Sequence, residues 1–235
     1  MSSDPVIKIN NVWKKFKINK NMRNNLREDI ENIFLNGRNN GIGNDEFWAL
    51  KDINININKG ESVGLYGPNG SGKTTIIKLL ANVTYPTKGE IKVIGKVAPL
   101  ISVGAGFHPE LTGKENIYTN GAILGMSIKQ IKECQDQIID FSGIEYQFLE
   151  MPVKNYSSGM TTRLGFSVAV HSNADIFLLD EILAVGDEAF REKCLIKIEE
   201  LIKLNKTILL VTHNKDFLDR IACRTIFINK GQITN

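Results

Sequence analysis

The fold of the chain follows from one stretch, Gly67-Pro68-Asn69-Gly70-Ser71-Gly72-Lys73-Thr74-Thr75. A short apolar run, 63–66, precedes it, and apolar residues at helical spacing follow it between 76 and 80. Strand, glycine loop and helix in this order fit the pattern G-x-x-x-x-G-K-[ST], which is typical of a phosphate-binding loop. The glycines let backbone N–H groups converge on an anion, and the positive end of the helix dipole faces the same point. A glycine-rich turn without a ligand is the simpler interpretation, but the complete motif favours a nucleoside triphosphate site.

Polar side chains supply the chemistry of this site. Lys73 offers a positive charge to the β and γ phosphate oxygens, and Thr74 offers a hydroxyl ligand to Mg²⁺. The apolar run 176–179 ends in Asp180 and Glu181, which is typical of the second half of an ATPase site. We expect Asp180 to hold Mg²⁺ opposite Thr74, and Glu181 to act on the attacking water. An acidic pair at a strand end is common by itself, but the upstream glycine loop favours the catalytic interpretation.

Composition sets the broad class of the protein. The 235 residues are 42% hydrophobic, which suits one large α/β domain or a core with a small subdomain. A net charge of +3 is too small to indicate nucleic-acid binding, and three widely separated cysteines fit buried thiols in a reducing compartment. No apolar run approaches the ~18 residues that span a bilayer, and the first residues lack the apolar core of a signal peptide. We therefore expect a soluble or peripheral protein that serves a membrane only through a partner.

The N-terminal part is basic. Residues 6–27 hold seven basic side chains and no acidic one. A solvated loop face is the simpler interpretation, and a patch for anionic lipid or a partner protein is the alternative. Residues 19–46 are polar and rich in Asn and Gly, so we expect an insertion or loop there.

Strands and helices alternate along the rest of the chain. Isoleucines alternate with asparagines over 53–58, which predicts a strand with one buried face. Thr112 and Ser127 each open a capping box, which predicts two consecutive helices. We expect strands near 6–9, 53–57, 63–66, 90–94, 176–179 and 207–211, an irregular stretch over 100–109, helices near 73–81, 112–124, 127–143, 156–172, 187–202 and 217–221, and a hairpin over 225–233. This alternation predicts a parallel sheet whose ligands bind at the carboxyl ends of its strands.

A third motif lies between the glycine loop and the acidic strand. It reads Tyr156-Ser157-Ser158-Gly159-Met160, and a Ser and a Gly at a helix N-terminus make a second anion site. With this motif, and with His213 after the last buried strand, the chain resembles the nucleotide-binding subunits of ABC transporters, whose signature is similar to L-S-G-G-Q. The resemblance covers residues from about 6 to 233.

The resemblance implies an α/β fold, namely a P-loop NTPase (RecA-like) parallel-sheet core with an N-terminal antiparallel β region and an inserted helical subdomain. It implies a single ABC ATPase domain over residues 1–235. Within it, residues 5–99 and 160–235 would form the β region and the RecA-like core. Residues 100–159 would form the helical subdomain, with the signature motif at its end.

The resemblance also implies a composite ATPase site. ATP would be bound by the loop 67–75, with Mg²⁺ on Thr74 and Asp180. Lys73, Glu181 and His213 would be catalytic, because His213 matches the switch histidine that contacts the γ-phosphate in the family.

A second copy of the chain would complete this site. The signature residues Ser157, Ser158 and Gly159 would face the γ-phosphate bound by that copy, so that two chains meet head to tail. Phe16 would stack on the adenine, with Trp13 and Trp48 as alternatives. His171 lacks a comparable context and is expected to be structural.

Two departures from the general family pattern indicate a subgroup. Residues 100–109 contain no Gln, which the family uses there to sense Mg²⁺ and to contact its transport partner. Ser102 and His108 are the open alternatives. The stretch 104–117, the wording of the signature and the insertion before the second strand are similar to the ATPases that export O-antigen, capsule and wall teichoic acid. Some of these add a carbohydrate-binding domain, so a chain that ends at Asn235 either lacks that domain or was cut before it.

The subgroup implies an ATP-hydrolysing subunit that powers a separate membrane permease for a lipid-linked polysaccharide or teichoic acid. We expect the permease to dock on residues 100–150 at the cytoplasmic face of the membrane, and we expect neither a nucleic-acid partner nor direct membrane contact. Three alternatives stay open: export of a drug, lipid or peptide, a non-transport ABC protein that acts on ribosomes or DNA, and a regulator without hydrolysis. A single glycine loop without a heptad run argues against the second, and Glu181 with His213 argues against the third.

Overall fold

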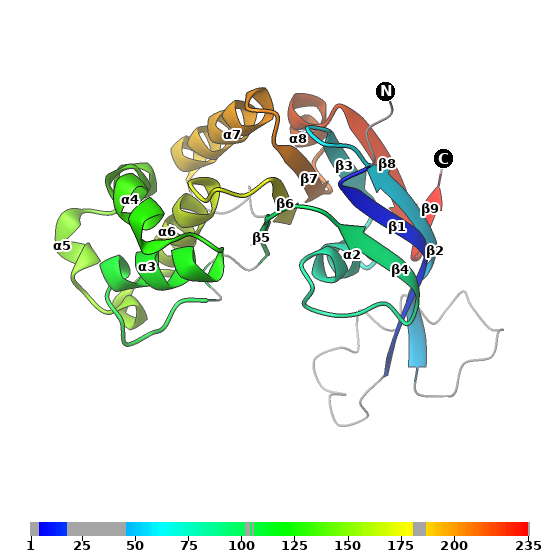
Figure 1. Cartoon of the computed structure of the whole chain (residues 1–235), viewed down its shortest axis with the longest axis horizontal. Coiled ribbons are helices and arrows are strands. Elements are labelled where there is room, and N and C mark those ends of the chain that lie inside the picture. Colours follow the sequence, from blue (N-terminus) through cyan, green and yellow to red (C-terminus); the bar gives the residue numbers. More distant parts are fainter. Residues whose placement is uncertain (1–4, 18–45, 102–103, 105, 181–186, 235) are drawn as a thin grey trace.

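The computed structural model describes residues 5–17, 46–101, 104, 106–180 and 187–234. A three-stranded sheet and a six-stranded sheet lie at one end of the molecule, and a group of helices lies at the other (Figure 1). This arrangement is the α/β fold, with a parallel core and an antiparallel N-terminal region, that the motifs predict.

The antiparallel sheet has the strand order β2-β1-β4. Its strands are β1 (Ile7–Lys17), β2 (Glu46–Ile57) and β4 (Lys88–Val93). Ile7 pairs with Ile57, and both side chains are buried. The alternation of isoleucine with polar residues therefore gives this sheet one buried face, as the sequence predicts.

The parallel sheet has the order β5-β6-β7-β3-β8-β9, and only β8 and β9 pair antiparallel. Its strands are β3 (Ser62–Tyr66), β5 (Val97–Leu100), β6 (Ile176–Asp180), β7 (Thr207–Thr212), β8 (Arg224–Asn229) and β9 (Gln232–Thr234).

Both faces of the central strands are buried. Phe177 and Leu179 of β6 pack in one cluster with α7 (Glu188–Lys203) and α8 (Lys215–Ile221). Ile176 and Leu178 pack in a second cluster with α2 (Lys73–Leu80) and the antiparallel sheet. Figure 1 shows α7 and α8 above the sheet and α2 below it. Because such strands are dry on both faces, they read in sequence as continuous apolar runs.

The helical part has a core of its own, built on Ile117, Ile131, Ile138 and Leu164. Its elements are α3 (Gly113–Ile123), α4 (Ile128–Ser142), α5 (Tyr146–Leu149), the 3₁₀ turn Val153–Asn155 and α6 (Ser158–Val170). Both predicted capping boxes form, at the starts of α3 and α4. In the described part of the chain, no helix combines the length and the apolar composition needed to cross a bilayer.

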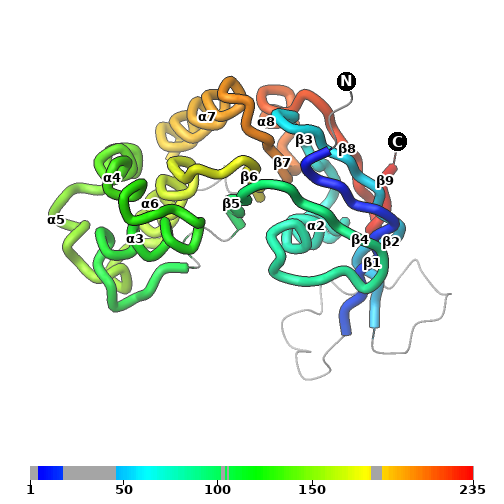
Figure 2. Tube along the Cα trace, viewed as in Figure 1, coloured from blue at the N-terminus to red at the C-terminus, as the bar shows by residue number. Residues whose placement is uncertain are grey.

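The path of the chain places this helical part between two neighbouring strands. The chain leaves the sheet after β5, passes through α3 to α6 and returns as β6 (Figure 2). β5 and β6 pair in parallel, with Leu100 opposite Leu179. The sequence pattern does not predict β5, because the strand has only four residues and contains Pro99. Proline is tolerated there because β5 is an edge strand of the sheet.

Candidate functional site: an ATP site at the sheet edge

The glycine loop joins β3 to α2 at the carboxyl edge of the parallel sheet. Gly72 is the N-cap of α2 with a φ of 110°, a left-handed conformation that favours glycine. A Cβ at Gly67 would lie 2.1 Å from the carbonyl oxygen of Ile228, so the loop can pass β8 only as glycine. No side chain of the described residues caps α2, which leaves the positive end of this helix to a ligand.

Two polar side chains of the loop turn inward. Lys73 is 5% exposed, and its Nζ donates hydrogen bonds to the carbonyl oxygens of Gly67 (2.6 Å) and Pro68 (3.0 Å). The ammonium group therefore lies within the curve of the loop. The Oγ of Ser71 is buried without a hydrogen-bond partner among the described residues. A buried hydroxyl is costly unless a ligand satisfies it, so the loop fits a phosphate group.

Asp180 ends β6 and His213 follows β7, and these are the two strands next in order to β3 on one side of the sheet. Val211 of β7 pairs with Leu65 of β3 on one side and with Asp180 of β6 on the other. His213 directly follows the end of β7 and is exposed. The topology therefore brings the loop, the carboxylate and the histidine to one edge, although they are far apart in sequence. Glu181 lies outside the described residues.

The oxygen ligands at this edge suit Mg²⁺. Thr74 lies in the first turn of α2 and is exposed, and Asp180 ends β6 two strands away from the loop. A hydroxyl and a carboxylate are hard oxygen ligands, and Mg²⁺ is usually held by one or two of these together with phosphate oxygens and water.

The signature motif forms the start of α6. Ser157 is the N-cap, and its Oγ accepts a hydrogen bond from the backbone N–H of Met160 at 3.1 Å. Ser157 and Ser158 are exposed, and a Cβ at Gly159 would meet nothing closer than Ser157 Oγ, at 3.7 Å. The first turn of α6 therefore presents hydroxyl groups and a helix N-terminus to an approaching anion.

The stretch 104–117 runs beside the residues that lead into the signature. The backbone N–H of Val153 donates to the carbonyl oxygen of Leu111, and that of Lys154 to the carbonyl oxygen of Pro109, both at 2.9 Å. The stretch 104–117 is thus hydrogen-bonded to the residues that immediately precede the signature.

Tyr156 fixes the signature from the other side. Its hydroxyl donates a hydrogen bond to the carbonyl oxygen of Phe148 at 2.7 Å. A Cβ at Gly113 would lie 2.0 Å from this hydroxyl, so the start of α3 must be glycine to admit the tyrosine. The glycine of the subgroup motif is therefore explained by packing against the signature.

Asn116 organises the turn before α3. Its side chain is fully buried, its Oδ1 accepts from the N–H of His108 at 2.8 Å, and its Nδ2 donates to the carbonyl oxygens of His108, Leu111 and Thr112 at 3.0–3.1 Å. The ring of His108 accepts a hydrogen bond from the N–H of Glu110 at 3.3 Å. His108 is thus engaged within this turn, and Ser102 lies outside the described residues, so the substitute for the missing Gln stays a prediction.

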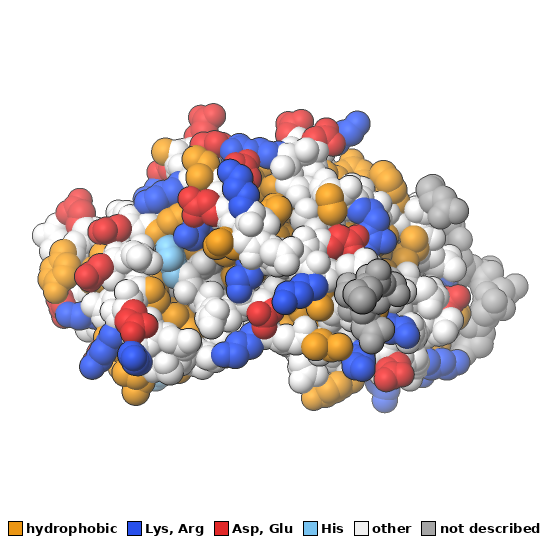
Figure 3. All heavy atoms as spheres, turned by 45° about the horizontal axis from the view of Figure 1, so that its top comes forward, with side chains coloured by type: hydrophobic (Ala, Val, Ile, Leu, Met, Phe, Trp, Pro, Cys, Tyr) orange, Lys and Arg blue, Asp and Glu red, His pale blue; other side chains and the backbone are white. Residues whose placement is uncertain are grey.

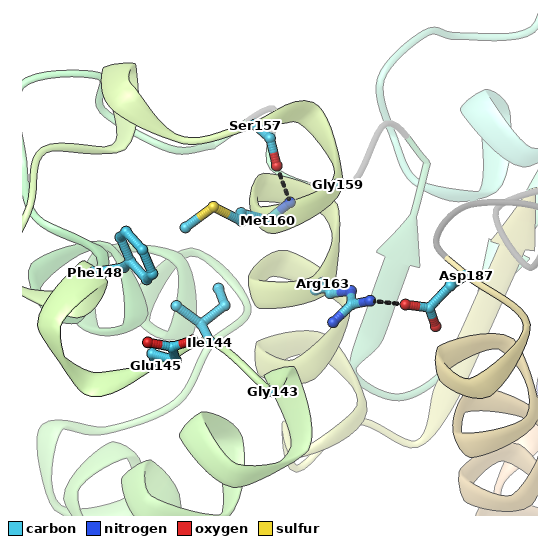
Figure 4. Close-up of a pocket in the computed structure, with 9 residues that line it drawn as sticks. All are labelled: Gly143, Ile144, Glu145, Phe148, Ser157, Gly159, Met160, Arg163 and Asp187. Atoms are coloured by element: carbon cyan, nitrogen blue, oxygen red, sulfur yellow. Dashed lines mark hydrogen bonds and ion pairs between the residues drawn. The ribbon is translucent and has the colours of Figure 1, made fainter.

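A cavity of about 360 Å³ lies beside the signature turn (Figure 4). Ser157, Gly159 and Met160 at the start of α6 line one wall, and the connection 143–145 between α4 and α5, together with Phe148 of α5, lines another. Arg163 and Asp187 join across the remaining side in an ion pair. One flank of the first turn of α6 is therefore not covered by packed side chains.

Sequence reasoning missed Asn116 and Arg163. Arg163 has a sequence signal, since it is the only Lys, Arg, Asp or Glu between 155 and 174. Asn116 has none, because a polar residue four places after the cap Thr112 would be expected to be exposed.

His171 lies at the end of α6. Its Nδ1 donates to the carbonyl oxygen of Ser167 at 2.8 Å, and its ring packs edge-on against Phe141. Burial lowers the pKa of His171. These contacts support the structural role that the sequence predicts.

The aromatic candidates for the adenine contact fall into two groups. Phe16 packs against Phe47 with ring centroids 5.9 Å apart. Trp13 and Trp48 meet edge to face at 5.4 Å, and the Nζ of Lys88 lies 5.9 and 5.8 Å from their ring centroids. The adenine contact therefore has two candidate positions on β1 and β2, one at the Phe16–Phe47 pair and one at the Trp13–Trp48 pair.

We expect Phe16→Ala to weaken ATP binding by about fivefold to a hundredfold, since stacking of one base on an aromatic ring contributes about 1–3 kcal/mol. Inorganic tripolyphosphate lacks the base, so its Kd should not change. Calorimetric titration with both ligands measures this difference, and Trp13→Ala is the matched control. Weaker ATP binding by the Trp13 variant with normal binding by the Phe16 variant would show that the other group holds the base.

Comparison with known proteins identifies the family. The ABC transporter family model matches residues 50–184, more than half of the chain. The O-antigen export system ATP-binding protein RfbB of Klebsiella pneumoniae is 39% identical, over 98% of this chain and 92% of that protein. The teichoic acids export ATP-binding protein TagH of Lactiplantibacillus plantarum is 39% identical over 99% of this chain, which spans 62% of its length.

Solved structures agree on the fold. A dimeric ATP-binding cassette bound to ADP and Pi matches over 97% of both chains, with a TM-score of 0.76 and 22% sequence identity. A further dimeric structure of a bacterial ABC transporter cassette has the same TM-score at 23% identity. The chain therefore belongs to the ABC transporter family.

Proposed function

We propose that the chain is the ATP-hydrolysing subunit of an exporter for a lipid-linked polysaccharide or teichoic acid, and that it powers a separate membrane permease. The observation that carries this proposal is its likeness over nearly the whole chain to an O-antigen export ATP-binding protein. The likeness to a teichoic acid export protein points to the same class of cargo. The close packing of Gly113 against the Tyr156 hydroxyl supports it, because it brings the stretch 104–117 into contact with the signature.

The chain acts as a single ATPase domain in this proposal. Residues 5–99 and 160–235 supply the β region and the RecA-like core, and residues 100–159 supply the helical subdomain. The pairing of β5 with β6 supports this division, because the helical part leaves and rejoins the sheet at neighbouring strands.

The loop 67–75 binds the triphosphate of ATP. The Lys73 ammonium exchanges the carbonyl oxygens of Gly67 and Pro68 for phosphate oxygens, which carry more negative charge. When bound, Mg²⁺ neutralises charge on the β and γ oxygens, and Thr74 and Asp180 are the residues that hold it.

Hydrolysis depends on two residues at the strand ends. Glu181 orients and deprotonates the water for in-line attack, and His213 steadies the γ-phosphate. Catalysis is then positioning and charge stabilisation rather than covalent chemistry. A second copy of the chain offers Ser157, Ser158 and Gly159 to the same γ-phosphate, so that each site is shared by two chains.

The permease docks on residues 100–150. Exposed apolar side chains in this range support the assignment: Ile123 is 64% exposed, Ile128 66% and Tyr146 63%. The face drawn in Figure 3 mixes basic with acidic side chains and presents no continuous basic surface among its described residues, and we propose no nucleic-acid partner. The chain works at the cytoplasmic side of the membrane and touches the membrane only through the permease.

The proposal is tested with the chain and its permease together in liposomes. We expect ATP hydrolysis to rise when a lipid-linked glycan is added, and to stay at its basal rate with the same lipid lacking the glycan. A drug and a short peptide are the competing cargoes. If either of these stimulated hydrolysis and the glycan did not, the proposed cargo would be wrong. The assignment of the chain as an ATPase would still hold.

A further inference from the structure

We propose that Arg163 is a positioning residue that holds the signature turn of α6 in a fixed relation to the start of α7, through its ion pair with Asp187. The inference rests on the proposed function, because it assigns Arg163 to the same ATPase cycle. It adds a residue that touches neither nucleotide nor metal in that proposal.

Three helices meet at the guanidinium group of Arg163. It pairs with the carboxylate of Asp187, and its central carbon lies 5.1 Å from the ring centroid of Phe190 on α7. A Cβ at Gly143, the C-cap of α4, would lie 3.6 Å from one of its nitrogens, an ordinary van der Waals contact. The Arg163 side chain is 27% exposed and that of Asp187 60%, so the arginine is the more enclosed partner of the pair.

Asp187 has two partners. Its Oδ1 accepts a hydrogen bond from the N–H of Phe190 at 2.8 Å and so caps α7, while its Oδ2 faces Arg163. The hydrogen bond from Phe190, helped by the charge of Arg163, lowers the pKa of Asp187. The same carboxylate thus caps α7 with one oxygen and pairs with Arg163 through the other. Asp187 is also the seventh residue after Asp180, so the start of α7 follows closely in sequence on the strand that carries the proposed Mg²⁺ ligand.

Arg163 is rigidly connected to the signature. It lies six residues after Ser157 on the same helix, less than two turns away. The cavity leaves one flank of the first turn of α6 open, so packing does not hold that flank in place. The Arg163–Asp187 pair closes the edge of this cavity (Figure 4) and supplies a restraint where packing is missing.

Deeper contacts join the same helices without reaching the signature. Phe141, Phe166 and Phe190 pack with ring centroids 5.9–6.1 Å apart. The Nζ of Lys193 donates to the carbonyl oxygens of Asp140 and Phe141 at 2.9 and 3.0 Å. These contacts should keep the variants folded, so that loss of the ion pair changes alignment more than stability.

The test is a double-mutant cycle with Arg163→Gln and Asp187→Asn, since asparagine still caps a helix. We expect each change to lower kcat for ATP hydrolysis about tenfold, because small misplacements at a reacting centre cost that much or more. KM and the ATP Kd of the isolated chain should stay within about twofold. The double variant should be no slower than either single variant, and Arg163→Lys should recover part of the rate.

Arg220→Gln is the matched control. Arg220 pairs with Glu192 at 2.8 Å and with Glu199 at 2.5 Å, both on α7, and its side chain is 35% exposed. It thus binds the same helix without contacting α6 in the described structure. The inference would be overturned by any of three results. These are a normal kcat for Arg163→Gln, a loss of kcat for Arg220→Gln as large as that for Arg163→Gln, or a loss in the double variant equal to the product of the two single losses.

A Lys73→Ala variant separates this inference from the proposed function. If wild-type chain and Lys73→Ala hydrolyse ATP equally, the proposed function itself fails. If Lys73→Ala is inactive while Arg163→Gln matches wild type, only the positioning role is wrong.

Discussion

Glu181→Gln is expected to keep ATP binding and to lower kcat by about 10²–10⁴-fold, which is what a positioned general base contributes. Glutamine has nearly the shape of glutamate but cannot accept the proton of the attacking water. Glu181 follows Asp180, whose strand ends at the edge that carries the glycine loop. Single-turnover hydrolysis and ATP titration on the same preparation measure the two effects separately.

Glu188→Gln provides the control for this change. Glu188 is an exposed carboxylate in the first turn of α7, close in sequence and outside the proposed site. It should hydrolyse ATP at the wild-type rate. Steady hydrolysis by the Glu181 variant would remove Glu181 as the base and leave water activation to another group.

Lys73→Ala is expected to weaken ATP binding by about tenfold to a hundredfold, because a hydrogen bond to a charged group contributes about 1.5–3 kcal/mol. The side chain is buried within its own loop, where its Nζ contacts the carbonyl oxygens of Gly67 and Pro68. Lys78→Ala is the matched control, since Lys78 is exposed on the same helix. Equal affinity for ATP in the two variants would contradict the phosphate-loop assignment.

Mixing Lys73→Ala with Ser157→Ala then tests whether the site is shared. Each variant alone should be inactive, because both sites of its homodimer are damaged. A mixed dimer has one site with an intact Lys73 from one chain and an intact Ser157 from the other. Random pairing of equal amounts should restore about one quarter of the wild-type rate if the two sites act independently. Absence of any recovery would mean that each chain completes its own site.

The predictable features are those that depend on local sequence. The glycine loop, the two capping boxes and the apolar strands 176–179 and 207–211 each carry a pattern whose physical cause is local. The resemblance to the ABC family orders these pieces, and the relatives at 39% identity bear out the family.

The features that could not be predicted depend on contacts between distant segments. The hydrogen bonds of Leu111 and Pro109 to the residues before the signature link main-chain groups, which no side-chain pattern announces. Arg163 and Asp187 meet because α6 and α7 pack together, although the sequence separates them by a complete strand. The sequence could not show that the phenylalanines and the tryptophans of β1 and β2 form two separate pairs. The register between these strands shifts along β1, so the pairing partners cannot be counted from the sequence.

The pairing of β5 with β6 has a consequence for how such chains diverge. The helical part leaves the sheet at Leu100 and rejoins it at Ile176, on two neighbouring strands. Its last helix, α6, packs on the sheet through Phe166 and Val170. Insertions, deletions and substitutions between β5 and α6 therefore need not disturb the order of the strands that carry the glycine loop and Asp180. The block between β5 and the signature can then change with the membrane partner and its cargo, while the strand ends and the signature that serve nucleotide hydrolysis are kept.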